Sequence, residues 1–456
     1  MGTILSEYLR INDRGHLQVE EADCLDLVEA YGTPLFVTSE NQIRYNYRRF
    51  YQAFAKRYPR VTVLFANKSN SNLAVRRVLT QEGAGGDCFG VGELMVSLLG
   101  GVPPHNLVMN GSNKELPEIA AAIQLGVAIN VDHPEELELV NETARRLGLK
   151  AIVSLRVLPF TFADPSALSG DLASIASDKS HDKWGMDRPA LREAVARSLD
   201  LPNLKLSGLH CHISRLRPTA EPFGLAADLM VRAMAELRDE FDWEPEALDM
   251  GGGFAHDRDP ESQKPAGDHA VSSPEEYAEA MATVLRDGLA KYGLSEPRLL
   301  LEPGRRLISN STVLLARVGI IKRLPTPGSK TWVNIDASTN HCLRTSILGY
   351  HYEIINASRG HAPNEITVNI VGPNCTMDMI GEDRPFPRTE RGDILAILDT
   401  GGYAEVNANQ FNSIPRPATV LVHGGEAEVI RRRETIQDIL ATQEVPLRLM
   451  RETPGA

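Results

Sequence analysis

The chain has 456 residues, which is long enough for two ordinary domains or for one large barrel with an extra domain. Hydrophobic residues make up 42% of it and charged residues 24%, a balance typical of soluble globular proteins that excludes a mainly disordered or fibrous chain. The formal net charge of -12 gives no sign of a phosphate-binding basic patch, so we expect no nucleic-acid partner.

The sequence shows no targeting segment and no cysteine pattern typical of disulfides or metal sites. No apolar run approaches ~18 residues, and the first 21 residues lack a signal peptide's basic and apolar regions, so we expect neither secretion nor membrane insertion. The cysteines are odd in number and have no CxxC spacing, which argues against a disulfide framework and a thiolate metal site. Reduced thiols in a cytoplasm fit this pattern best. These cysteines are Cys24, Cys88, Cys211, Cys342 and Cys375.

A strand and helix rhythm runs through residues 35–305. Short apolar runs such as VTVLFAN at 61–67 alternate with amphipathic segments such as SNLAVRRVLTQEG at 71–83. About eight such units follow one another, which favours a (β/α)8 TIM barrel over an open doubly wound sheet. The first unit also lacks the GxGxxG motif of a dinucleotide-binding fold.

The pattern changes after residue 305. Runs such as TWVNIDAS at 331–338 and PATVLVHG at 417–424 are β-rich and are separated by turn residues. We therefore predict a C-terminal β-domain, sandwich-like or barrel-like, that takes an early strand from the N-terminus. The predicted division is a barrel of residues 35–305 and a β-domain of residues 1–34 and 306–456.

Residues able to carry chemistry fall at the ends of the predicted barrel strands. Each has an ordinary explanation by itself: a lysine after a strand is usually solvated, a glycine triplet is usually a turn, and His210 with His212 is only a weak zinc pattern. In a TIM barrel, however, the carboxyl ends of all strands meet at one face, where active sites lie. The residues concerned are Lys68, Asp87, Cys88, Arg156, His210, His212, Gly251, Gly252, Gly253 and Glu302.

The order of short motifs carries a family resemblance. In chain order the motifs are FANKSN, GGDCFGVGEL, NGSNK, INVDHPEEL, KWGM, HCHISR, DMGGGF, EPGRR, GPNCTMD, TGGYAE and FNSIPRP. In this order the chain resembles, nearly end to end, the alanine-racemase-like, fold-type III pyridoxal-phosphate enzymes, and among them the diaminopimelate and ornithine decarboxylase group. The resemblance implies pyridoxal 5'-phosphate as cofactor, a barrel with a β-domain, and decarboxylation of an amino acid, at a D-configured centre as in the diaminopimelate branch.

The resemblance also implies roles for single residues. Lys68 would hold the cofactor covalently, Glu302 would face the pyridine nitrogen and His212 would stack on the ring. Asp87 and Arg156 would lie around the lysine linkage and the ring oxygen. The expected phosphate contacts are Gly251, Gly252, Gly253, Gly304, Arg305, Tyr403 and Arg215, the last standing where the family usually has a serine.

Cys375 lies in the predicted β-domain, not in the barrel. In the family this cysteine reaches the cofactor of the partner subunit and gives a proton to the carbanion. The resemblance therefore implies a homodimer with active sites shared across the interface.

The substrate pocket departs from the family at two places. Diaminopimelate decarboxylases usually have a glutamate after this cysteine and a tyrosine four residues after the arginine equivalent to Arg344, whereas this chain has Thr376 and Leu348. Arg305 and Arg344 remain to bind a carboxylate, with Tyr403 beside the substrate. We therefore expect poor binding of a distal ammonium, unless another residue, for instance Asp378 or Glu405, supplies the missing charge.

Three other functions stay open on the sequence alone. The first is authentic meso-diaminopimelate decarboxylation, as in lysine biosynthesis. The second is amino-acid racemisation, although racemases of this fold place a tyrosine in the β-domain where this chain offers Cys375. The third is a non-catalytic cofactor carrier, which the long C-terminal β-domain argues against.

Overall fold

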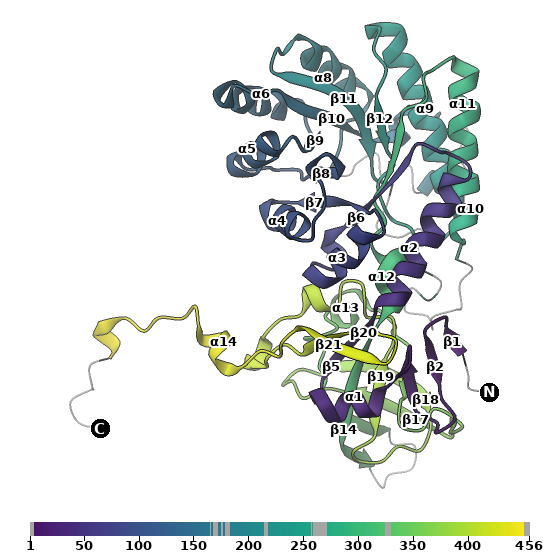
Figure 1. Ribbon diagram of the computed structural model, residues 1–456, viewed down its shortest axis with the longest axis vertical. Coiled ribbons are helices and arrows are strands. Elements are labelled where there is room, and N and C mark those ends of the chain that lie inside the picture. The colour runs from purple at the N-terminus through teal and green to yellow at the C-terminus, as the bar shows by residue number, and fades with distance from the viewer. Residues whose placement is uncertain are drawn as a thin grey trace.

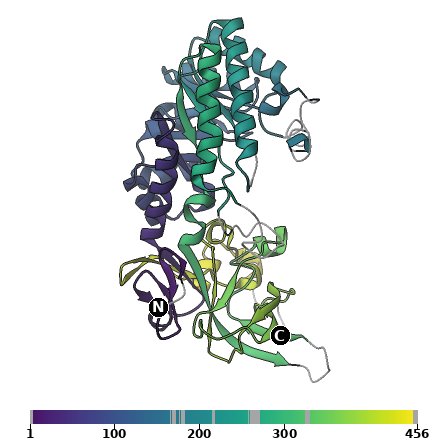
Figure 2. The same cartoon turned by 90° about the vertical axis from the view of Figure 1, so that its right-hand side faces the viewer.

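The computed structural model describes residues 4–164, 166, 172–174, 177, 183–213, 218–256, 258, 271–323 and 330–450. Figure 1 shows a barrel surrounded by helices above a domain built mostly of strands. The view at right angles to it, in Figure 2, shows long helices running along the outside of the barrel towards the second domain.

Eight parallel strands close into the barrel, with β9 paired to β10 and β13 paired to β6. This confirms the predicted (β/α)8 barrel. The strands are β6 (Val61–Ala66), β7 (Gly85–Phe89), β8 (Leu107–Asn110), β9 (Ala128–Val131), β10 (Ala151–Val157), β11 (Leu204–Cys211), β12 (Ala247–Asp249) and β13 (Arg298–Leu301).

Helices cover the outer face of the barrel and bury their apolar sides against its strands. Local sequence sets their ends: Ser273 and Glu276 form a capping box at the start of α10, and Gly126 ends α5 in the left-handed conformation at φ 69°. The helices are α2 (Glu40–Ala55), α3 (Leu73–Gln81), α4 (Val91–Leu99), α5 (Leu116–Leu125), α6 (Glu136–Leu147), α8 (Arg188–Asp200), α9 (Glu221–Phe241), α10 (Pro274–Ala278), α11 (Val284–Tyr292) and α12 (Arg305–Ile308).

The second domain is built on a nine-stranded sheet, in which β5, β14 and β20 are central neighbours. A separate four-stranded antiparallel sheet, β1 to β4, packs beside it. The nine strands are β5 (Leu35–Ser39), β14 (Thr312–Arg323), β15 (Thr331–Ile335), β16 (Ile354–Asn356), β17 (Ile366–Val371), β18 (Met379–Phe386), β19 (Ile394–Ile397), β20 (Ala418–His423) and β21 (Glu426–Arg431). The small sheet has β1 (Ile4–Ser6), β2 (Leu9–Ile11), β3 (Leu17–Val19) and β4 (Ala22–Asp23).

Short helical segments complete both domains. In the second domain they are α1 (Cys24–Tyr31), α13 (Arg344–Leu348), α14 (Ile436–Leu440) and the 3-10 turns Glu405–Asn407, Phe411–Ser413 and Leu447–Leu449. In the barrel part they are the 3-10 turns Asn67–Ser69, Pro104–Asn106, Pro159–Phe162 and Ser309–Ser311, and the π turn Glu279–Thr283 between α10 and α11.

The strand β5 belongs to the second domain, although its residues fall inside the range that the sequence analysis gave to the barrel. It pairs antiparallel with β14 and parallel with β20. All five of its residues are buried, and a short buried apolar run does not tell which sheet it joins. The chain crosses into the barrel directly after it, where Ser39 caps α2.

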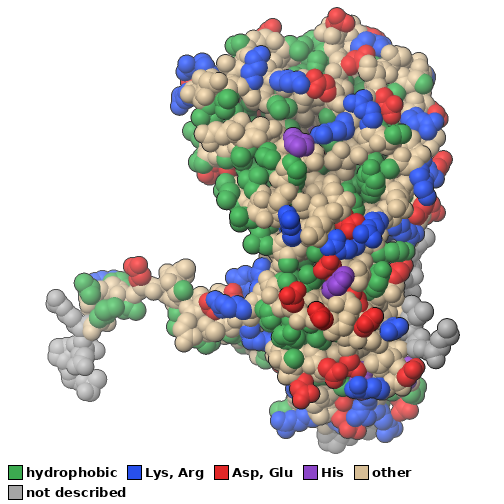
Figure 3. Space-filling model, in the orientation of Figure 1, with side chains coloured by type: hydrophobic (Ala, Val, Ile, Leu, Met, Phe, Trp, Pro, Cys, Tyr) green, Lys and Arg blue, Asp and Glu red, His purple; other side chains and the backbone are tan. Residues whose placement is uncertain are grey.

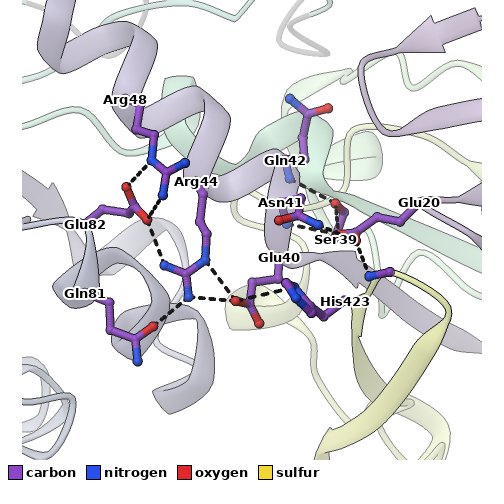
Figure 4. Close-up of polar contacts among 11 residues, drawn as sticks. Glu20, Ser39, Glu40, Asn41, Gln42, Arg44, Arg48, Gln81, Glu82 and His423 are labelled. Carbon is purple, nitrogen blue, oxygen red and sulfur yellow. Dashed lines mark hydrogen bonds and ion pairs between the residues drawn. The ribbon is translucent and has the colours of Figure 1, made fainter.

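A network of polar contacts joins the two domains at the start of α2 (Figure 4). Glu20, in the turn between β3 and β4, accepts two hydrogen bonds from Asn41 at the start of α2, one from its N–H at 3.0 Å and one from its side-chain amide at 2.7 Å. Glu40, the first residue of α2, lies 3.7 Å from Nδ1 of His423 at the end of β20, and it also pairs with Arg44 at 2.6 Å. These contacts fix the barrel relative to the sheet, and the site described below draws residues from both.

The C-terminal residues leave the body as an arm after β21 (Figures 1 and 3). The arm is tied at its root by Glu434, which pairs with Arg416 at 3.0 Å. Its large apolar side chains are exposed at Ile436, Leu440, Val445, Leu447, Leu449 and Met450. Over the residues described, no helix combines the length and apolar character needed to cross a membrane.

Candidate active site

A cavity of about 260 Å³ opens at the carboxyl end of the barrel strands, where the second domain meets the barrel. Among its lining residues are many that the sequence analysis singled out: Lys68, Arg156, His210, His212, Gly253, Glu302, Gly304, Arg305, Arg344 and Tyr403. The other lining residues are Ala66, Phe89, Asn110, Trp184 and Phe254.

Lys68 reaches this cavity from the short turn that follows β6. Its Nζ pairs directly with the carboxylate of Asp87, a fully buried residue of β7, and lies 4.8 Å from the centre of the Phe89 ring. Burial opposes the charge of Lys68, but the carboxylates of Asp87 and Glu302 outweigh it, so the pKa of the amine is raised. Lys68 is thus held as an oriented ammonium.

Asn110, at the end of β8, ties the two carboxylates of the site together. Its amide nitrogen donates to Asp87 Oδ1 and to Glu302 Oε1, both at 2.7 Å, and Asn130 donates to its carbonyl oxygen at 2.9 Å. Burial opposes the charge of Glu302, but His210 and Lys68 more than compensate and lower the pKa of Glu302. Asn110 opens the NGSNK motif, but the motif by itself does not indicate this role.

His212 stands over the glycine triplet. Its Nδ1 accepts a hydrogen bond from the Gly252 N–H at 3.0 Å, and burial, together with the charges of Lys68 and Arg156, lowers the pKa of the imidazole well below its usual range. The ring is therefore neutral. Side chains are excluded below it: a Cβ on Gly251 would lie 2.4 Å from the Cys211 carbonyl oxygen, and one on Gly252 would lie 2.4 Å from that of Glu302.

Two arginines converge on the side of the cavity that faces the second domain. Arg305 and Arg344 both donate to the hydroxyl of Tyr350, at 2.9 and 2.7 Å, and the Arg344 guanidinium lies 3.9 Å from the centre of the Tyr403 ring. Tyr403 is fixed at φ 65° with its N–H on the Ser69 carbonyl oxygen at 2.8 Å. Paired guanidiniums held in this way form a receptor for a carboxylate or phosphate.

Arg156, at the end of β10, lies on another wall of the cavity. Its Nη1 is 3.5 Å from Asp132 Oδ1, and its guanidinium lies 5.4 Å from the centre of the Trp184 ring. Trp184 also lines the cavity and belongs to the KWGM motif, but the sequence analysis gave it no role.

Cys375 and Thr376 lie outside this cavity. Cys375 is exposed, with its Sγ 3.4 Å from Asn412 Oδ1, while burial raises the pKa of the thiols of the other four cysteines. Thr376 lines a second, open cavity of about 860 Å³ on the β-domain. Leu348 ends α13 and is 38% exposed. Arg215 lies outside the described residues.

The donor set fits pyridoxal 5'-phosphate. A lysine amine suits its aldehyde, a buried carboxylate held ionised suits a protonated ring nitrogen, and arginines beside a glycine-lined backbone suit its phosphate. Gly251 and Gly252 matter for this fit, because their Cβ positions are already taken by backbone atoms and the histidine ring.

Comparison with known proteins decides the family. Residues 41–309 match the family described as pyridoxal-dependent decarboxylase, pyridoxal binding domain. The chain belongs to this pyridoxal-dependent decarboxylase family. It is therefore a carboxy-lyase that uses pyridoxal 5'-phosphate, as the order of motifs predicted.

Relatives of this decarboxylase match it along nearly the whole chain. The diaminopimelate decarboxylase of Methanothermobacter thermautotrophicus is 34% identical over 97% of this chain and 99% of its own length. That of Bacillus subtilis is 32% identical over 94% and 96%. The crystal structure of diaminopimelate decarboxylase from M. jannaschii superposes with a TM-score of 0.88 at 33% identity, covering 97% of this chain and 99% of that one.

Proposed function

We propose that this decarboxylase removes the carboxylate at a D-configured centre of an amino acid whose far end is an acid, an amide or a larger conjugate. When bound, pyridoxal 5'-phosphate supplies an electron sink for the bond to the departing carboxylate. Lys68 holds the cofactor, and the ionised Glu302 faces its ring nitrogen. The neutral ring of His212 packs on the cofactor and brings no positive charge of its own.

Residues in and next to the cavity support the remaining contacts. Asp87, paired with Lys68, and Arg156, on the cavity wall, serve the region where the lysine meets the cofactor. Gly251, Gly252, Gly253 and Gly304 let an anionic phosphate approach the backbone. Arg305 and Arg344, which share the Tyr350 hydroxyl, bind a substrate carboxylate beside Tyr403.

Thr376 is the reason for proposing that the far end of the substrate is not an ammonium. A distal ammonium needs an acceptor, preferably a charged one, and a threonine hydroxyl brings no charge. Asp378 does not replace it, because it is 4% exposed and already accepts hydrogen bonds from Ser338 and Thr339. Glu405 is likewise engaged, 2.7 Å from Arg431.

We also propose that the enzyme is a homodimer in which Cys375 of one subunit completes the site of the other. The supporting observation is that Cys375 is exposed and stands apart from the cavity that contains Lys68. Apolar side chains are exposed on the same face: Met377 at 67% and Phe411 at 48%, both lining the larger cavity. The free state of all five cysteines supports a cytoplasmic location.

A second candidate is meso-diaminopimelate decarboxylation. It is favoured by the names of the relatives, which match at 31–34% identity over nearly their full lengths. Glu382 and Asp383 also line the larger cavity with Thr376, where they pair with Lys330 at 3.6 and 3.1 Å. For this function, these carboxylates would bind the distal ammonium in place of the glutamate that the family usually has at position 376.

A substrate panel tests the proposal. The purified, cofactor-loaded enzyme is incubated with D- and L-amino acids, meso-diaminopimelate and amino acids with distal carboxylates, amides and conjugates, and the CO2 and the products are measured. We expect CO2 from D-configured centres with a distal acid, amide or conjugate, and none with Lys68→Ala. Preferred turnover of meso-diaminopimelate would support the second candidate, and racemisation without CO2 would contradict both.

A further inference from the structure

Asp249 is the last residue of β12 and is 2% exposed. Its Oδ1 accepts a hydrogen bond from the Gly251 N–H at 2.9 Å, at the start of the glycine triplet. Its Oδ2 is equally buried, yet it accepts no hydrogen bond from any N–H or O–H donor of the described residues. A buried carboxylate oxygen without a donor is costly, so the ionic state of this group needs an explanation.

The barrel places two titratable groups beside the carboxyl group of Asp249. In the strand ladder, His210 of β11 lies opposite Asp249, and Asp249 lies opposite Leu300 of β13, two residues before Glu302. A ring nitrogen of His210 and one carboxyl oxygen each from Asp249 and Glu302 lie within 4.8 Å of one another. All three residues are buried. The carboxyl groups of Asp249 and Glu302 therefore face each other away from water.

Two such carboxyl groups cannot both be ionised, and the surroundings decide which one keeps the proton. Glu302 has the amide of Asn110 at 2.7 Å, His210 Nε2 at 3.7 Å and the ammonium of Lys68 near it. Asp249 has one backbone N–H, and Asp87 adds a further negative charge. Burial, followed by the charge of Glu302, raises the pKa of Asp249 well above its usual range.

The remaining charged or titratable neighbours do not reverse this order. Arg298 lies at the first residue of β13, at the opposite end of the strand from Glu302, and its own burial lowers its pKa. The thiol of Cys211 is buried, and its pKa is raised, so it brings no charge.

We propose that Asp249 is a neutral carboxylic acid that donates a hydrogen bond to Glu302, and so acts as a positioning residue for the carboxylate that faces the cofactor ring. The inference rests on the proposed placing of the ring nitrogen against Glu302. With Asn110 on one oxygen and Asp249 as a second donor, Glu302 is kept both oriented and ionised. The glycine triplet is tied to the same group through the Gly251 N–H.

Infrared spectroscopy tests the protonation directly. The C=O stretch of a protonated carboxyl is separate from carboxylate bands. It is measured in a Glu93→Gln background, which removes another carboxyl whose pKa burial raises, to about 7, and we expect it at neutral pH with and without the cofactor. Asp249→Asn should remove this band, whereas Asp87→Asn, a matched change of another buried aspartate in the same site, should leave it. Absence of the band in the Glu93→Gln enzyme, or its survival when Asp249→Asn is added, would overturn the proposal. Because the cofactor-free protein is measured too, this result does not depend on the proposed substrate.

Cofactor affinity tests the positioning role. In Asp249→Asn the new amide can accept from Gly251 and donate to Glu302. The dissociation constant of pyridoxal 5'-phosphate should therefore stay within about threefold of the wild-type value, a smaller change than the loss of one hydrogen bond to a charged group would cause. Asp249→Leu, which has a similar size and no donor, should raise it by about tenfold to a hundredfold, the effect of losing a hydrogen bond to a charged group. If both variants bound pyridoxal 5'-phosphate equally weakly, the carboxyl group of Asp249 would not act as a hydrogen-bond donor. A folding defect in Asp249→Leu would leave the infrared result decisive.

Discussion

Lys68 and Asp87 form a direct ion pair that joins the ends of two neighbouring barrel strands. Asp87 lies opposite Ala66 in the ladder of β6 and β7, and Lys68 follows Ala66 by two residues. The pair keeps the amine charged before the cofactor arrives, whereas attack on an aldehyde needs the neutral amine. In the proposed site, Asp87 therefore helps to set the pH at which Lys68 reacts with the cofactor.

Asp87→Asn should make Lys68 react with the cofactor at lower pH. Burial lowers the pKa of Lys68 and the carboxylates of Asp87 and Glu302 raise it above the usual value, so removing one carboxylate lowers it. The measurement is the rate at which cofactor-free enzyme recombines with pyridoxal 5'-phosphate as a function of pH. Asp393→Asn, a buried aspartate of the β-domain, is the control and should leave the profile unchanged. A profile in Asp87→Asn that does not move would contradict the role of the ion pair.

Lys68→Ala should abolish the visible absorbance that the bound cofactor shows when it is linked to a lysine. Turnover should fall by on the order of 10³-fold or more, as when other covalent groups are removed. Borohydride reduction of the wild type followed by peptide mapping should label Lys68. Lys205→Ala is a suitable control, because Lys205 is exposed and its pairing with Glu246 contributes little. Labelling of a different lysine would show that the cofactor site is assigned wrongly.

Cys375→Ala should lower turnover by about 10²- to 10⁴-fold, as expected for a group that transfers a proton, while cofactor remains bound. Mixing inactive Lys68→Ala and Cys375→Ala subunits should restore about a quarter of wild-type activity, because half of the dimers are then mixed and each has one intact site. Each variant assayed alone is the control. Mixed dimers that are formed but stay inactive would rule out a site shared between subunits.

Glu93→Gln should stabilise the enzyme at alkaline pH and change little in acid. Burial raises the pKa of Glu93 from 4.5 to about 7, so the folded state binds the proton more tightly than the unfolded state. The stability gained from this is present below the unfolded pKa and is lost as pH rises towards the folded one. The difference is at most about 3 kcal/mol, at 1.36 kcal/mol for each pKa unit.

Glutamine keeps an oxygen for the Phe89 N–H, which Glu93 Oε2 accepts at 2.7 Å. Denaturation midpoints of the wild type and Glu93→Gln should therefore be close at about pH 4 and diverge by about pH 8. If the denaturation midpoints of the two proteins differed by the same amount at both pH values, Glu93 would not titrate between them.

The parts of the site that follow from strand order were predictable from the sequence. Lys68, Arg156 and Glu302 end strands of a parallel barrel, and such ends meet at one face whatever the spacing between them in the chain. Asn110 and Asp249 also end strands, but their roles come from partners across the ladder, and these depend on register. Sequence periodicity carries no register between distant strands.

The domain crossing shows a second limit. Residues 35–39 are apolar and short, and they satisfy a barrel strand and a sheet strand equally well until their partners are known. The position of Cys375 outside the Lys68 cavity was predicted by the family resemblance alone. Composition and spacing did not predict it, because a separation of 307 residues along the chain does not tell whether two side chains meet.

Thr376→Glu should raise kcat/KM for meso-diaminopimelate. The glutamate would give the distal ammonium a charged acceptor, and a hydrogen bond to a charged group contributes about 1.5–3 kcal/mol, or about tenfold to a hundredfold in kcat/KM. Thr376→Gln is the matched control, since it adds the same length without the charge and should gain much less. For a substrate with a distal acid, Thr376→Glu should instead lower kcat/KM, because two carboxylates would then repel each other.

This opposite response of two substrates is what separates the proposed pocket from an ordinary diaminopimelate decarboxylase. Asp378 also lines the cavity around Thr376, but it is 4% exposed and is held by Ser338 and Thr339, so Glu382 and Asp383 are the carboxylates there that can serve a ligand. If these two serve the ammonium, wild-type enzyme already turns over meso-diaminopimelate efficiently, and the added glutamate brings no gain. That result would exclude a substrate without a distal amine, and Glu382→Gln would then be expected to lower kcat/KM for meso-diaminopimelate.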